Sequence, residues 1–240
     1  MVTIEQLTVA DEPATWAALG FSVDGDRCRL GDVTVRLAGR DAGRGLVSWT
    51  LRGLPGSGVA ALDGLATARA SGEEGPGDSA GDGEATHGGK DRTDAREPSP
   101  AAERAGAAHP NGIEAIDHVV VIAPQLDRTV AALEAAGLDL RRIREQPTPA
   151  GAPRQAFFRL GAEIVEVVQE PAEVSVRLGG PERPAFFWGL ALRCPDLDAT
   201  VAALGEERSG AVRDAVQPGR RIATLRRAAG LALPIALMGA

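Results

Sequence analysis

The 240-residue sequence contains no tyrosine, and aromatic residues make up only 3% of it. Its interior must therefore consist mainly of Ala, Leu and Val, within a hydrophobic fraction of 44% that is ordinary for a globular protein. No apolar run approaches the roughly 18–20 residues that a membrane-spanning helix needs. The first residues also lack the basic and apolar regions of a signal peptide. These absences predict a cytoplasmic protein without a membrane partner.

Cysteine is scarce, and positive charge is outweighed by negative charge. Cys28 and Cys194 are the only cysteines, and they lie in different segments without CxxC spacing. This favours two buried thiols in a reducing compartment over a disulfide. The net charge of −7 and the pI near 5.1 exclude a general polyanion binder. We therefore expect no nucleic-acid partner.

Residues 71–112 lack Val, Ile, Leu, Met and every aromatic residue. Such a segment cannot bury enough apolar surface to offset the entropy of ordering it, so we expect a disordered linker. At its far end His109 precedes Pro110 and an Asn-Gly pair, which favours a turn leading into the next strand. Residues 1–70 and 113–240 are left as the folded regions.

Residues 113–240 contain the same series of elements twice. Alternating and helical patterns predict the order β-α-β-β-β over 113–171, and the order recurs over 184–240. The segments Pro124–Leu133 and Pro195–Leu204 share most of their residues. An internal repeat of this size indicates gene duplication and two units that share one core. The fold class is therefore α+β.

Residues 1–70 resemble a shorter, degenerate copy of the same unit. A strand over 3–10, a helix over 11–20, a hairpin turning at Asp24-Gly25 and a closing strand over 32–39 would complete it. A further strand over 45–54 and a helix over 57–68 would begin a truncated fourth unit. We expect this region to pack beside the later units or to pair between chains, which would allow a homodimer.

A duplicated unit that opens with "DHVVV" and "TVAALEAAGL" and closes with "LGAEIVEVV" resembles the vicinal oxygen chelate superfamily. That superfamily includes glyoxalase I, extradiol dioxygenases, fosfomycin-resistance proteins and bleomycin-binding proteins. The resemblance implies paired βαβββ units that form a curled mixed sheet around a cavity. It also implies a small-molecule ligand, and a divalent metal held by the first and last strands of each unit. It does not specify a reaction, because the fold hosts many.

Two of the metal positions implied by the resemblance carry suitable residues, namely His118 and Glu166, which suit Zn, Mn, Fe or Ni. Counting along the second unit gives Gly189 and Ile235 as their counterparts, and neither can bind a metal through its side chain. Two hypotheses follow. The chain is a binder or metal-free enzyme, or it is a metal-dependent lyase or dioxygenase that holds a divalent ion weakly through His118 and Glu166.

Further residues are candidates for the ligand pocket. The segment Arg213–Arg227 contains five arginines and a turn at Pro218-Gly219. It is either an exposed, solvated hairpin or a source of contacts from Gln217, Arg220 or Arg221 to an anionic or carbonyl-bearing ligand, because arginine offers planar donors to carboxylates. Trp188 is either part of the core or an apolar wall of the pocket.

Overall fold

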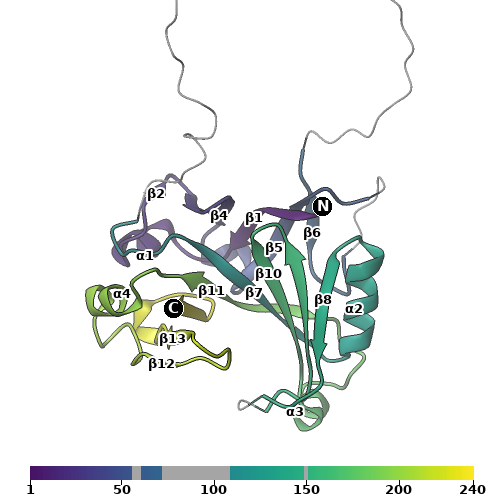
Figure 1. Cartoon of the computed structure of the whole chain (residues 1–240). Helices are drawn as coiled ribbons and strands as arrows, with labels where there is room; N and C mark the ends of the chain where they lie inside the picture. Colours follow the sequence, from purple (N-terminus) through teal and green to yellow (C-terminus); the bar gives the residue numbers. More distant parts are fainter. Residues whose placement is uncertain (56–60, 72–108, 149–150) are drawn as a thin grey trace, which may run out of the picture.

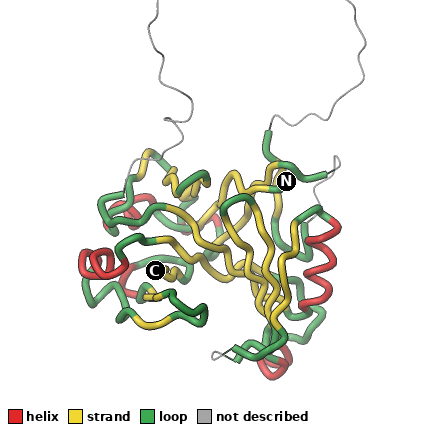
Figure 2. Tube along the Cα trace, viewed as in Figure 1, coloured by secondary structure: helices red, strands yellow, loops and turns green. Residues whose placement is uncertain are grey.

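The computed structural model describes residues 1–55, 61–71, 109–148 and 151–240, so most of the predicted linker lies outside the described residues. The chain forms two mixed β-sheets, with short helices at the periphery (Figures 1 and 2). The α+β prediction is confirmed. Cys28 and Cys194 are both free and buried. Within the described residues, every helix is too short or too polar to cross a membrane.

Residues 113–240 build an eight-stranded sheet with the order β12-β13-β14-β11-β7-β10-β9-β8. In each unit the first strand runs parallel to the last, and the two first strands pair antiparallel at the centre. The predicted pairing of repeated βαβββ units is therefore confirmed. The first unit contains β7 (Ala115–Ala123), α2 (Leu126–Ala135), β8 (Asp139–Arg144), β9 (Gln155–Leu160) and β10 (Glu163–Gln169). The second contains β11 (Phe186–Arg193), α4 (Leu197–Leu204), β12 (Arg213–Asp214), β13 (Arg221–Thr224) and β14 (Ile235–Gly239).

The helices of the two units form where the sequence places apolar residues at helical spacing. In α2 the side chains of Leu126, Val130 and Leu133 form one buried stripe. In α4 the side chain of Asp196 caps the helix by accepting the Ala199 N–H at 2.9 Å. A short helix that the sequence analysis did not predict, α3 (Ala172–Arg177), connects the two units.

The N-terminal residues form a six-stranded sheet with the order β2-β3-β4-β1-β5-β6. Its first part repeats the βαβββ series. Next to it, β5 pairs antiparallel with β1 and parallel with β6, as a first and a last strand would without the elements between them. The elements are β1 (Thr3–Val9), α1 (Pro13–Ala18), β2 (Val23–Asp24), β3 (Arg27–Leu30), β4 (Val33–Leu37), β5 (Leu46–Arg52) and β6 (Thr67–Arg69).

The helix predicted over 57–68 is wrong for its described part. Residues 61–71 instead contain a turn, an isolated bridge between Leu62 and Leu65, and strand β6. Asp63 and Gly64 both have positive φ angles, of 47° and 91°, which a right-handed helix cannot contain. Gly64 also lies against Pro184, where a Cβ would meet the proline ring at once. Packing against the second unit therefore decides the conformation here.

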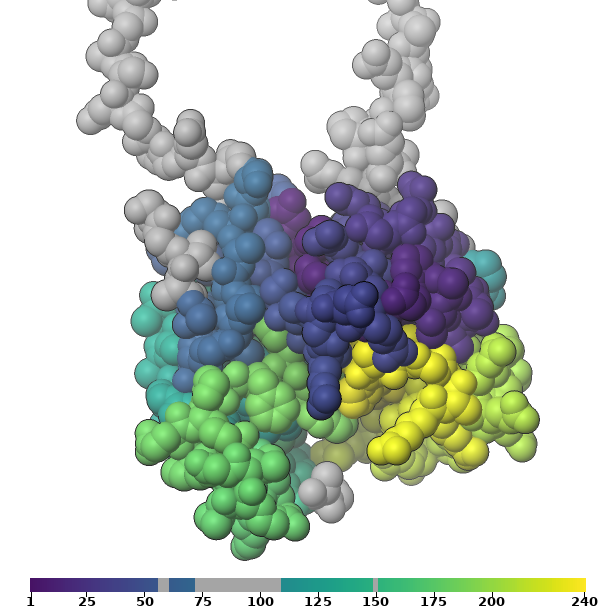
Figure 3. Space-filling model, turned by 180° about the vertical axis from the view of Figure 1, so that it is seen from behind, coloured from purple at the N-terminus to yellow at the C-terminus, as the bar shows by residue number. Residues whose placement is uncertain are grey.

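The two sheets share one hydrophobic core. Trp49 of β5 packs edge-on against Phe187 of β11, with ring centroids 5.1 Å apart. The buried carboxylate of Asp11 accepts the Ala232 N–H at 2.7 Å, which fastens the N-terminal sheet to the loop before β14. In the view from behind, the N-terminal residues lie directly on the yellow C-terminal residues (Figure 3).

The folded body begins before the predicted linker ends. His109 is only 6% exposed; its Nδ1 accepts the Ser22 N–H at 2.9 Å, and its Nε2 lies 2.9 Å from the Arg29 carbonyl oxygen. The Asn111 amide donates to the Leu19 carbonyl at 3.0 Å. The boundary at residue 112 is therefore four residues too late. Apolar content could not reveal it, because these side chains are buried through hydrogen bonds to the N-terminal unit's backbone.

Candidate functional site

The eight-stranded sheet has two faces of different character. On β7 the side chains of Val119, Val121 and Ala123 are buried, whereas His118, Val120 and Ile122 are partly exposed. On β10 the alternation places Glu166 between Ile164 and Val168 on the same partly exposed face. We call this the site face, and we call the opposite face, which packs on the N-terminal sheet, the core face. His118 and Glu166 both lie on the site face, as the alternation predicts.

The first strands of two units pair in both sheets, β7 with β11 and β1 with β5, and each pairing contains two β-bulges at equivalent positions. Asp117 and Trp188 have no partner in the pairing of β7 with β11, and each lies two residues before the central pair Val119 and Leu190. Glu5 and Val47 are skipped in the same way in the pairing of β1 with β5. A bulge places two consecutive residues opposite one partner, so both can face the same side of the sheet. The first strand of each repeated unit thus has a bulge at the same position, directly before the residue equivalent to His118.

The bulge places Asp117 beside His118 on the site face, where it starts a chain of polar contacts. The Asp117 carboxylate accepts from His118 Nδ1 at 2.8 Å through Oδ2 and from Arg220 Nη2 at 2.7 Å through Oδ1. His118 Nε2 lies 3.3 Å from Glu166 Oε2, and Gln155 Nε2 donates to Glu166 Oε1. The side chains of Asp117, His118, Glu166 and Arg220 are 16–24% exposed, so ligands in solvent can reach them.

The sequence analysis missed two residues that take part in these polar contacts, Asp117 and Gln155. Strict alternation assigns Asp117 to the core face, and only the bulge moves it beside His118. The adjacent "DH" letters were the signal, but they do not reveal a bulge. Gln155 occupies the start of β9, where its side chain is 7% exposed. It reaches Glu166 because the two strands pair, which the sequence does not show.

The pKa values of the two carboxylates in this series of contacts, Asp117 and Glu166, are shifted in opposite directions. Burial alone would raise the pKa of Asp117, but hydrogen bonds and charge from His118 and Arg220 lower it to about 2. Burial raises the pKa of Glu166, although His118 and Gln155 partly oppose the rise. A charged Asp117 accepts a hydrogen from His118 Nδ1, which leaves Nε2 directed at Glu166. The contact with Asp117 therefore fixes the orientation of the His118 ring, and its Nε2 faces Glu166.

The second unit offers no metal ligand at the position of His118. The central pair Val119 and Leu190 makes Gly189 the counterpart of His118. A Cβ at Gly189 would lie 2.5 Å from the Pro234 carbonyl oxygen, so no other side chain fits without a shift of the backbone. The loss of a ligand here follows from the close approach of β11 to the residue before β14.

The counterpart of Glu166 is Ala236, and the assignment to Ile235 is wrong by one residue. Glu166 pairs with Val120 in the first unit, and the equivalent partner of Ala191 in the second unit is Ala236. Ile235 is 1% exposed and faces the core. A one-residue change of register moves a side chain to the other face of a sheet. Counting from Gly230 could not reveal this, because the loop before β14 differs in length.

The residues present do not fit a tightly held divalent metal. Catalytic zinc sites usually have three protein ligands and structural sites four, whereas this site has His118 and Glu166. Within the described residues, no group of three His, Cys, Asp or Glu side chains is arranged to hold a metal ion. In the N-terminal sheet the four equivalent positions, read from the same register, carry Gln6, Arg36, Ser48 and Ala68.

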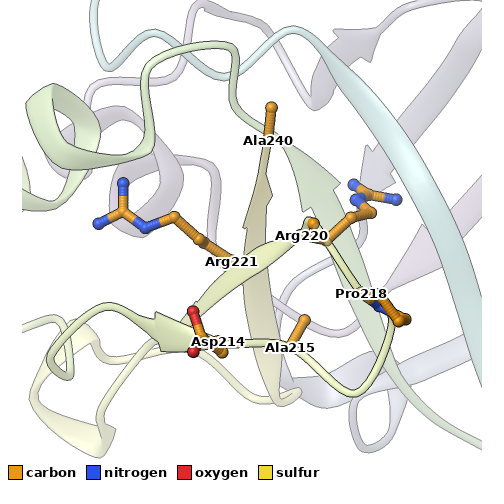
Figure 4. Close-up of a pocket in the computed structure, with 7 residues that line it drawn as sticks. Asp214, Ala215, Pro218, Arg220, Arg221 and Ala240 are labelled. Carbon is orange, nitrogen blue, oxygen red and sulfur yellow. The ribbon is translucent and has the colours of Figure 1, made fainter.

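The other predicted pocket residues are placed differently from one another. Arg220 reaches the site face through Asp117, whereas Arg221 turns to Asp198 on α4 with contacts of 2.7 and 2.8 Å. Gln217 is exposed at the hairpin turn. Figure 4 shows the two arginine side chains diverging on either side of a pocket at this hairpin. The pocket is lined by Asp214, Ala215, Pro218, Gly219, Arg220, Arg221 and Ala240.

Comparison with known proteins finds similar structures but no similar sequence. No protein-family model matches the chain, and no curated protein is similar to it in sequence. A fusion of a xylose isomerase-like TIM barrel with 4-hydroxyphenylpyruvate dioxygenase has 14% identity and a TM-score of 0.57, covering 99% of this chain and 49% of its own. At that identity the likeness concerns the fold alone.

Methylmalonyl-CoA epimerases are similar to about half of the chain. The epimerase from Mycobacterium tuberculosis has 20% identity and a TM-score of 0.44, covering 53% of this chain and 89% of its own. An epimerase variant from Streptomyces coelicolor, in complex with 2-nitronate-propionyl-CoA, has 18% identity and a TM-score of 0.41, covering 52% and 96%. The strand order, the paired units and the whole-chain likeness together show that this chain has the vicinal oxygen chelate fold.

Proposed function

We propose that this chain binds a small anionic or carbonyl-bearing organic molecule on the site face, at His118, Glu166 and Arg220, without a tightly held metal. The observation that carries the proposal is the chain of contacts from Arg220 through Asp117 and His118 to Glu166. Polar groups that converge on an otherwise apolar surface are typical of small-molecule sites, where they orient the ligand.

Two groups at this site, one donor and one acceptor, have capacity for a ligand. Within the described residues, the side-chain contact of Arg220 runs through Nη2, so the other guanidinium donors remain for a carboxylate or carbonyl oxygen. Gln155 Oε1 is buried and has no hydrogen-bond partner among the described residues. A buried acceptor without a donor is costly, so a ligand hydroxyl or a bridging water would stabilise it.

The alternative is a metal-dependent lyase or dioxygenase that uses His118 and Glu166. Both residue types bind divalent ions, and their contact of 3.3 Å brings the two side chains together. Gly189 and Ala236 supply no further ligand on the opposite strands. The two functions differ in a measurable quantity, which is the metal content of protein purified without chelators.

The test combines elemental analysis with thermal unfolding in pyruvate, which carries both a carboxylate and a carbonyl. We expect substoichiometric metal in the wild type. We also expect pyruvate to raise the unfolding midpoint, because a ligand that binds only the folded state stabilises it by mass action. The rise should disappear in His118→Ala and Arg220→Gln. It should persist in Arg221→Gln, the matched control, whose guanidinium is bound to Asp198 away from the site face.

Two results would contradict the proposal. Stoichiometric metal that is lost in both His118→Ala and Glu166→Ala would establish the metal-dependent alternative. Pyruvate at about 100 times a millimolar Kd should stabilise the fold by about 2.7 kcal/mol. If the unfolding midpoint did not rise under these conditions, the binding site itself would be rejected.

A further inference from the structure

We infer that the molecule bound at the site face carries a flat ring that stacks on Trp188 and Phe186, next to the anionic or carbonyl group that His118 and Arg220 contact. This inference rests on the proposed function and adds the chemical class of the ligand, an aromatic carboxylate. It is carried by the placement of the two aromatic side chains, by their exposure, and by their continuity with the polar chain.

Trp188 is directed out of the core by its bulge. Its neighbours Phe187 and Leu190 belong to the core face, where Phe187 packs on Trp49 and Leu190 is 2% exposed. The register skips Trp188 between the pairs of Phe187 with Val121 and of Gly189 with Val120. Its side chain is 50% exposed. Trp188 therefore presents a large flat surface to solvent on the side opposite the core.

Phe186 lies on the site face by register alone. It pairs with Ile122 of β7, which lies on the same face as His118 and Val120, and it is 39% exposed. Directly paired residues of antiparallel strands have neighbouring side chains on the same face. Phe186, Ile122 and Val120 thus form an apolar surface that continues along β7 to His118.

Exposed large hydrophobic side chains are few in the described residues, and two of the six are aromatic residues of β11. Two are Phe186 and Trp188, and a third, Val216, is 58% exposed on the hairpin that carries Arg220. The remaining three are Met1, Val176 and Leu178. Aromatic rings exposed beside converging polar groups are typical of a ligand surface, because a stacked ring removes apolar area from water on both partners.

The charge of the site face suits a ring that bears a carboxylate. The Arg142 guanidinium already stacks on Phe157 of the same face, 4.6 Å from the ring centroid. Arg220, from the turn between β12 and β13, is bound to Asp117 of β7. A ligand with its ring on Trp188 would extend its anionic group along β7 toward His118 and Arg220, since Trp188 and Asp117 lie on either side of the central residue pair Val119 and Leu190.

The experiment uses tryptophan fluorescence, for which the chain is well suited. Trp16 and Trp49 are both fully buried, so Trp188 dominates quenching by acrylamide. The probes are benzoate and cyclohexanecarboxylate, which share a size and a charge but differ in flatness. We expect benzoate to protect Trp188 from acrylamide and to bind about three- to tenfold tighter than cyclohexanecarboxylate, the effect of one aromatic pair.

Two variants separate stacking from general packing. Trp188→Leu keeps an apolar side chain but removes the flat ring, so the preference for benzoate, followed by thermal unfolding, should fall to about onefold. Phe157→Leu is the matched control on the same face, two strands from β7, and should keep the preference. Equal binding of both probes, with Trp188 still quenched, would overturn the ring inference and leave the proposed function standing. Binding of neither probe, with no response to pyruvate, would reject both.

Discussion

At the scale of single residues, Asp117 determines how the site is organised. It lies on a bulge, accepts hydrogen bonds from His118 and Arg220, and connects two segments that are 103 residues apart in sequence. Without it, His118 would face Glu166 with its ring free to rotate, and Arg220 would have no partner on β7. The orientation of His118 is thus fixed by a neighbour that points to the same face only because of the bulge.

The pKa of Asp117 predicts how its contacts stabilise the fold. A pKa of about 2 in the folded state, against an ordinary value of 3.8, corresponds to about 2 kcal/mol of stability. Because the pKa is depressed, this contribution is complete above the ordinary value and is lost as the pH falls through the folded one. Asp117→Asn should therefore unfold about 2 kcal/mol more easily in urea at neutral pH, and the difference should shrink in acid.

The control for this prediction is Asp198→Asn. Asp198 pairs with Arg221, the neighbour of Arg220, but its side chain is 65% exposed. Exposed ion pairs contribute little to stability, so this variant should unfold like the wild type at every pH. Equal losses in the two variants, or a difference for Asp117→Asn that does not depend on pH, would contradict the assignment.

At the scale of the elements, strand register decides which residues can act together. Ala236 pairs with Ala191, and Ala191 pairs with His118, so the three lie in one row across β14, β11 and β7. Strands are about 4.8 Å apart, which places Ala236 about 10 Å from His118 on the same face. Ile235, one residue earlier, is buried in the core.

This register predicts how a metal site could be built. Ala236→Glu adds a carboxylate to the face that carries His118 and Glu166, as a third ligand, so it should increase the affinity for zinc, measured by calorimetry, about tenfold or more. Ile235→Glu is the matched control and should unfold the protein, because it buries an unpaired charge. A folded Ala236→Glu variant without a gain of zinc affinity would show that the three side chains do not converge.

Loop and turn chemistry explains the wrong element predictions. The helix expected over 57–68 had an acceptable apolar pattern, but Asp63 and Gly64 adopt positive φ where the chain meets Pro184. Asp63 also receives hydrogen bonds from Arg128 and Thr129 at the start of α2. These contacts are tertiary, so local propensity had no access to them.

At the scale of the whole molecule, the N-terminal sheet completes the core of the later units. One continuous apolar cluster runs through both sheets, and Trp49 and Asp11 join them through Phe187 and Ala232. The central strands β7 and β11 would expose their core face without this cover. The units over 113–240 share a sheet, but the sheet alone does not provide two covered faces.

This shared core predicts the behaviour of a divided chain. Two polypeptides covering residues 1–71 and 109–240 should assemble one to one when produced together, since the contacts between them are the core itself. Residues 109–240 alone should lack the near-ultraviolet circular dichroism of the complex, because Val119, Val121 and Phe187 lose their cover. A stable, native-like C-terminal piece on its own would show that the N-terminal sheet is dispensable for folding.

The sequence by itself determined the repeated unit, the α+β class and the faces of His118 and Glu166. These follow from residue spacing along one strand or helix, which is local information. Only the tertiary structure decided that Asp117 joins His118, that Arg220 rather than Arg221 reaches it, and that Ala236 faces the site. Each of these depends on which residues of two strands pair, and a bulge or a one-residue change of register alters the outcome without altering the pattern.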